Sequence, residues 1–167
     1  MAFWNSRRHD MLRWATTALD DTSCRVQAAC LLPLLAVARR ICSLAVIQTG
    51  LSWLCRIRLH HSSPRSSPQR AQARLDFARH AARIVDAAAV RGITRANCLD
   101  RSLALWCLLR RRGIPAELRL GARPIAGGIR AHAWIELDGR VVNDLEEICR
   151  QFAPFPFPCQ SLIYRAS

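Results

Sequence analysis

The chain has 167 residues, 51% of them hydrophobic, and its formal net charge is +13 because 25 basic residues outnumber 12 acidic ones. This length and composition suit one folded domain with some additional chain, and they exclude an intrinsically disordered protein. Every basic residue is arginine. The positive charge favours contact with acidic peptides, lipid head groups or nucleic acid, although a solvated basic surface explains it equally well.

The cysteines and the first residues bear on the compartment. None of the eight cysteines forms a Cys-x-x-Cys pair, which argues against a zinc ribbon or a thioredoxin motif. Residues 1–23 are polar and contain Asp10, Asp20 and Asp21, which does not fit a secretory signal peptide. We therefore expect a reducing, cytoplasmic setting with free thiols.

Residues 24–59 are rich in Ala, Leu, Ile and Val and predict helix. Pro33 and the pair Arg39 and Arg40 interrupt the apolar run, so that no clean stretch of about 18 apolar residues could span a membrane. Helices packed on a core are the favoured interpretation. A helix lying on an anionic membrane surface stays open as the alternative.

Residues 60–70 contain Ser, Pro and Arg but no apolar side chain, which predicts a linker or an exposed loop. The pair His60 and His61 has no Cys, Asp or Glu beside it to complete a metal site. We therefore divide the chain into a helical N-terminal segment with its linker, residues 1–70, and a core, residues 71–167.

The core begins with two predicted helices. Residues 71–91 carry apolar side chains at helical spacing, and Gly92 follows as a stop. The second helix has the strongest signals in the chain, with Asn97 as its N-cap and Asp100 as a carboxylate in its first turn. Gly113 supplies a left-handed position after its last turn.

The period then changes to that of strands. Residues 117–120 alternate, and residues 131–137 and 140–144 flank Asp138 and Gly139, a strong hairpin signal. The tail from Glu146 is expected to pack as irregular chain. Helices followed by a small antiparallel sheet define an α+β fold.

Cys98 would be the first residue of the second helix. Free backbone N–H groups and the positive end of the helix dipole would point at its sulfur, and both favour the thiolate that attacks carbonyls. No other cysteine has this combination, and a small buried hydrophobe is the expected role of each. Cys98 is therefore the candidate nucleophile.

His132 lies within a predicted strand, where a sheet could aim its imidazole as general base and acid. Asp144 on the partner strand could hold the other ring nitrogen. Register decides between Asp144 and Asn143, because side chains share a face only when opposite or two positions apart. A three-residue loop closed by Gly139 would set His132 opposite Asp144, and we favour it over a two-residue turn that would select Asn143.

The stretch from residue 97 to residue 144 resembles the transglutaminase-like core of lasso-peptide B proteins, the leader peptidases of lasso-peptide maturation. The matching pieces are Cys-Leu-x-Arg-Ser-Leu-Ala, Leu-Leu-Arg-Arg-Arg-Gly-Ile-Pro and Ala-His-Ala-Trp-Ile-Glu-x-x-Gly. The resemblance implies a papain-like fold in which a helix bearing Cys98 packs on an antiparallel sheet bearing His132 and Asp144. It implies the roles of nucleophile, base and orienting acid for these three residues.

Residues 1–70 show no alternating strands, so the small winged-helix-like leader-binding domain of some family members is not expected there. The chain is similar to the stand-alone protease form, which implies as partners a precursor peptide with its leader, a separate leader-binding protein and an ATP-dependent cyclase. Neither a metal nor an organic cofactor is implied.

Two rival functions stay open at this point. The same three residues would support transglutaminase-type acyl transfer to an amine. A non-catalytic basic adaptor that binds membrane or nucleic acid is the other, although no aromatic-interleaved basic stripe or helix-turn-helix signature favours nucleic acid.

Overall fold

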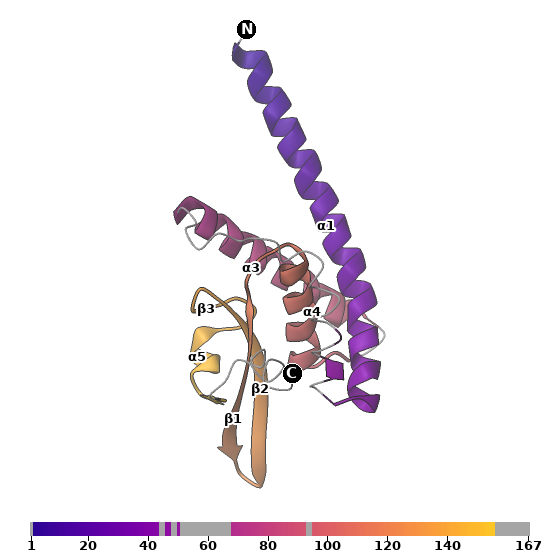
Figure 1. Ribbon diagram of the computed structural model, residues 1–167, viewed down its shortest axis with the longest axis vertical. Helices are drawn as coiled ribbons and strands as arrows, with labels where there is room; N and C mark the ends of the chain where they lie inside the picture. The colour runs from indigo at the N-terminus through magenta and orange to yellow at the C-terminus, as the bar shows by residue number, and fades with distance from the viewer. Residues whose placement is uncertain (1, 44–45, 48–49, 51–67, 93–94, 156–167) are drawn as a thin grey trace.

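The protein is described by a computed structural model that covers residues 2–43, 46–47, 50, 68–92 and 95–155 (Figure 1). Three helices dominate the chain: α1 (Ala2–Ile41), α3 (Pro68–Arg91) and α4 (Cys98–Arg111). The predicted helix over residues 24–59 is confirmed in part, but α1 begins far earlier, at Ala2, and residues 51–59 lie outside the described residues.

α3 begins at Pro68, so the end of the predicted linker belongs to this helix. A proline suits the first helical position, because its missing N–H would have no partner there and its fixed φ is already helical. The rest of the linker, with His60 and His61, lies outside the described residues.

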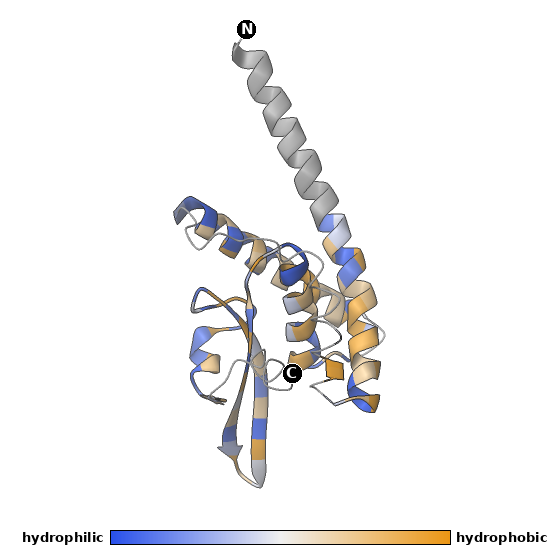
Figure 2. Ribbon diagram, in the orientation of Figure 1, coloured by the Kyte–Doolittle hydropathy of each residue, from blue (hydrophilic) through white to orange (hydrophobic). Residues whose placement is uncertain are grey.

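The main core lies between the helices and one face of the sheet. Cys24, Ala28, Leu32 and Leu35 recur at helical spacing on α1 and belong to the same buried cluster as α3 and α4. The packing expected for this part of the N-terminal segment is therefore confirmed for the described residues. Figure 2 shows the apolar stretch of α1 on the part that runs beside α4, and the two helices are in contact.

No described helix combines the length and the apolar character that a membrane crossing needs.

The sheet is antiparallel with the order β3-β2-β1-β4, formed by β1 (Glu117–Ile125), β2 (Gly128–Leu137), β3 (Arg140–Val141) and β4 (Ala153–Pro154). A short helix, α5 (Glu146–Cys149), follows β3. Ile135 and Leu137 of β2 face the α4 core, whereas Trp134 packs with Cys149 and Phe152 on the other face. The expected α+β fold, with the Cys98 helix on a small antiparallel sheet, is confirmed.

The hairpin between β2 and β3 corrects the favoured register. Leu137 pairs with Arg140, so that the turn has two residues and not three. Asp138 and Gly139 have φ values of 50° and 74°. Positive φ at both central residues is the type I′ geometry that Asp-Gly favours, because its twist matches that of the flanking strands.

Candidate active site

Cys98 is the first residue of α4, and the start of this helix is firmly capped. The Asn97 side chain accepts a hydrogen bond from the backbone N–H of Asp100 at 2.9 Å, and the Asp100 carboxylate accepts one from the Asn97 N–H at 3.1 Å. Asp100 is fully buried, whereas Cys98 is partly exposed. The predicted cap is confirmed, and it holds the Cys98 sulfur at the positive end of the helix dipole.

His132 and Asp144 are brought together. The Nε2 atom of His132 lies 2.7 Å from Oδ2 of Asp144, and both side chains are partly buried. The imidazole packs against Trp134 and Phe152, with ring centroids 6.0 Å and 5.0 Å away. The hydrogen bond to Asp144 engages Nε2 and leaves Nδ1 as the ring nitrogen that can exchange a proton with a thiol or a leaving group.

Asp144 reaches His132 although the register differs from the one expected, because the β3 ladder ends at Val141. Beyond the ladder, the Asn143 side chain bonds to β2 and α4. Its Oδ1 accepts from the Ile135 N–H at 2.7 Å, and its Nδ2 donates to the Ser102 hydroxyl at 3.0 Å. Asn143 is thereby turned toward α4. The chain then bends, so that Asp144 and not Asn143 bonds to His132.

No hydrogen bond joins Cys98 and His132. Cys98 shares a pocket of about 230 Å³ with Ala133, Asn143 and Asp144, and Asp86 and Arg101 complete its wall. Side chains alternate along a strand, so that Ala133 faces α4 whereas His132 faces α5. Asp144, at the end of the sheet, therefore belongs both to the pocket of Cys98 and to the hydrogen bond with His132.

Cys149 also belongs to the cluster of His132 and Asp144, although its sequence does not predict it. Its sulfur and the ligand atoms of His132 and Asp144 all lie within 4.8 Å of one another. Burial raises the pKa of the Cys149 thiol to about 12, and the negative charge of Asp144 adds to this effect. No sequence signal marks Cys149, because α5 is a single turn within a stretch predicted to be irregular.

The electrostatics of the two sulfurs differ accordingly. Cys149 is 5% exposed and stays protonated at neutral pH, so that it is a poor nucleophile. Its protonated thiol is also a poor metal ligand, and in the same group Nε2 of His132 and Oδ2 of Asp144 already satisfy each other. The three side chains are of the types that bind Zn²⁺, but a metal would have to displace both a proton and a hydrogen bond.

Comparison with known proteins places the chain in a family. Residues 41–156 match the family model described as the Transglutaminase-like superfamily. This match covers more than half of the chain, which therefore belongs to that superfamily. No curated protein and no solved structure matches the chain. A transglutaminase-like domain with clustered Cys, His and Asp side chains indicates activity of the cysteine peptidase or acyltransferase type.

Proposed function

We propose that the chain is a cysteine peptidase that removes the leader peptide from a lasso-peptide precursor, with Cys98, His132 and Asp144 in the catalytic roles. One observation carries the proposal. The 2.7 Å hydrogen bond between His132 and Asp144 lies at the edge of the pocket that contains Cys98. The lasso-peptide substrate rests on the sequence resemblance.

In the proposed reaction, His132 takes the Cys98 proton and the sulfur attacks the scissile carbonyl. The backbone N–H groups at the start of α4 have no intrahelical partner, and that of Cys98 can donate to the oxyanion. Protonated His132 then protonates the departing amine, and a water deprotonated by His132 hydrolyses the thioester. The products are the leader acid and the free amine of the core peptide.

The proposal requires the His132 ring and the Cys98 sulfur to approach, because they lie on opposite faces of β2. Catalytic contacts are commonly long in the absence of substrate and tighten in the complex. Asp144 is common to both surroundings, so that the two groups lie near the same end of the sheet.

Cys149 is the second candidate nucleophile, because it already lies beside His132. We favour Cys98 on two grounds. Its sulfur is accessible at a capped helix start, whereas Cys149 is buried and its thiol is held protonated. The resemblance to the lasso-peptide proteins also includes the Cys98 motif and not Cys149.

The six cysteines in the described part of the chain are free thiols, and the setting we propose is reducing and cytoplasmic. A separate leader-binding protein would present the precursor and raise its effective concentration at the site. An ATP-dependent cyclase would close the ring on the freed amine.

The test is the identity of the products. A precursor peptide incubated with the protein and the leader-binding partner should give leader acid and core peptide by mass spectrometry, and Cys98→Ala should give neither. Cys107→Ala is the matched control, since Cys107 is buried within the same helix. Leader joined to an added amine would instead establish transglutaminase-type transfer, and an intact precursor would contradict both.

A further inference from the structure

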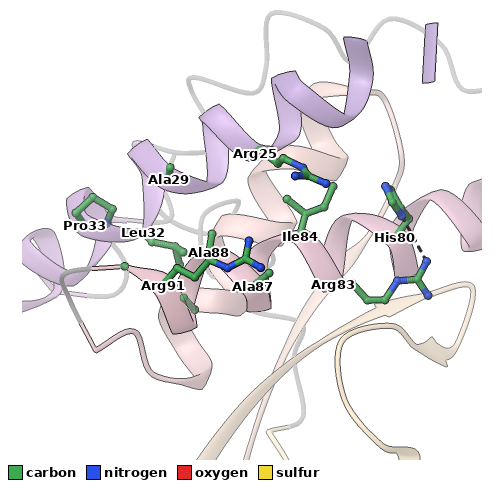
Figure 3. A pocket seen from close by; sticks show the side chains of 12 residues that line it. Arg25, Ala29, Leu32, Pro33, His80, Arg83, Ile84, Ala87, Ala88 and Arg91 are labelled. Carbon is green, nitrogen blue, oxygen red and sulfur yellow. Dashed lines mark hydrogen bonds between the residues drawn. The ribbon is translucent and has the colours of Figure 1, made fainter. Parts of the chain in front are cut away.

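A groove of about 620 Å³ lies between α1 and α3, away from the candidate active site (Figure 3). Its floor includes Leu32 and Ile84, which are buried in the main core. Its walls include Ala29, Ala87 and Ala88. Because alanine side chains are short, the facing helix surfaces leave a hollow with an apolar lining.

The groove and the pocket of Cys98 lie on different sides of one helix. Asp86 lines the Cys98 pocket, and its neighbour Ala87 lines the groove. A helix with its side chains is about 10–12 Å wide. A peptide seated in the groove would therefore be only a short stretch of extended chain away from Cys98.

The rim of the groove is positively charged. Asp21 is paired with Arg25 at 2.9 Å and with Nε2 of His80 at 2.6 Å. Nη2 of Arg83 lies 3.4 Å from Nδ1 of His80, which makes Nδ1 an acceptor and Nε2 the donor to Asp21. Neither Arg83 nor Arg91 has a carboxylate partner among the residues described, and both line the groove.

We propose that this groove binds an acidic, leucine-rich segment of a peptide substrate. Leucine side chains of the peptide would cover the apolar floor of the groove and remove that surface from water. Glutamate side chains would bind the arginines on its rim. Residues 51–67 carry three arginines and no acidic residue, and a second copy of the chain carries the same charge of +13. Like charge therefore disfavours both as occupants.

Binding can be measured without cleavage. The full chain carrying Cys98→Ala would be titrated into a fluorescein-labelled peptide of leucine and glutamate, and anisotropy would be recorded. A peptide in which lysine replaces glutamate should bind at least about tenfold more weakly. Arg83→Glu and the groove-filling Ala29→Trp should each weaken binding of the acidic peptide by about tenfold or more.

Two matched controls address charge and bulk. Arg79→Glu makes the same charge change one turn earlier on α3, and Cys30→Trp adds the same bulk beside Ala29. Both residues are exposed and lie outside the groove, so each variant should bind within about twofold of the parent. Circular dichroism and thermal unfolding would establish that all four variants are folded.

Three results would overturn the proposal. The acidic and basic peptides could bind equally, or Arg79→Glu could weaken binding as much as Arg83→Glu, which would mean diffuse attraction. Alternatively, sedimentation could show a dimer that Ala29→Trp dissociates, which would assign the groove to a second copy.

That the bound segment belongs to a substrate rests on the proposed function. In the wild-type chain, replacing the acidic residues of a cleavable precursor by glutamine should raise KM by about tenfold with kcat unchanged, and Arg83→Glu should abolish that difference. Absence of cleavage for every substrate would contradict the proposed peptidase and leave the binding result standing. Normal cleavage without peptide binding would contradict the groove alone.

Discussion

The Nε atom of Arg39 on α1 donates to Oδ1 of Asp100 on α4 at 3.0 Å, across 61 residues of sequence. Asp100 is fully buried and also caps the helix that begins at Cys98. A buried carboxylate deprived of its cationic partner is strongly unfavourable. This bond therefore fastens the N-terminal helix to the start of the candidate catalytic helix.

Arg39→Ala should lower the free energy of unfolding by on the order of 2–3 kcal/mol, less than the about 3–5 kcal/mol of a fully buried pair, because the Arg39 side chain is 36% exposed. Urea denaturation would measure it. Arg40→Ala removes the neighbouring exposed arginine and should change stability by no more than about 0.5 kcal/mol. Equal effects of the two substitutions would show that the bond to Asp100 contributes nothing.

Gly121 lies directly opposite His132 on β1, beneath the rings that hold the imidazole. A Cβ atom there would come within 2.9 Å of Trp134 and 3.0 Å of Phe152. Gly121→Ala should cost about 1–3 kcal/mol of unfolding free energy through overpacking, and it should slow cleavage by displacing His132. Gly128→Ala on β2 meets nothing within 4 Å and is the control, expected to leave Tm and rate nearly unchanged.

Asn143 joins the hairpin to α4 through the Ile135 N–H and the Ser102 hydroxyl. Asn143→Ala leaves these two groups, which belong to buried residues, without these partners and should cost about 1–3 kcal/mol by denaturant unfolding. Asn143→Asp keeps the acceptor for Ile135, so its loss of stability should be smaller at an acid pH where the new carboxyl is neutral and does not repel Asp86 and Asp144. A larger loss for Asn143→Asp at that pH would contradict this account of the bend before Asp144.

Burial raises the pKa of Asp86 beside the Cys98 pocket, against the opposing influence of Arg101. The folded state then holds the Asp86 proton more tightly than the unfolded state. This contribution to stability is fully present below pH 3.8, which is the ordinary pKa of an aspartate. It is lost as the pH rises through the higher folded-state pKa.

Asp86→Asn should therefore gain stability relative to the wild type as the pH rises from acid to neutral, by about a few tenths of a kcal/mol because the side chain is half exposed. Asp76→Asn, on the exposed side of α3, removes the same charge and controls for net charge. If the stability of Asp86→Asn relative to the wild type fell as the pH rose, the prediction would be contradicted.

Local chemistry allowed the helix start and the hairpin to be predicted. Asn97 and Asp100 form a cap within a stretch of only four residues. Asp138 and Gly139 form a turn because both residues favour the backbone conformation that it needs. The predicted register is wrong, because pairing Asp144 directly opposite His132 is not the only way to join the two side chains. The bend at Asn143 achieves that contact through a side chain bonded to Ser102, and no local pattern encodes it.

Contacts between elements that are distant in the sequence could not be predicted for the same reason. The bond from Arg39 to Asp100 and the approach of Cys149 to His132 depend on how distant elements pack. The faces of β2 follow from alternation alone, but which face α4 covers depends on packing. The separation of Cys98 from His132 therefore emerged only with the fold.

The central claim is that Cys98 is the nucleophile, and the direct measurement is to find which sulfur carries the acyl group. The protein would be mixed with precursor peptide, quenched in acid during turnover and digested, and mass spectrometry would locate the thioester-linked leader. The leader should be on the fragment with Cys98, and Cys98→Ala should abolish it while Cys149→Ala retains it. A leader found on Cys149, or retained in Cys98→Ala, would contradict the account.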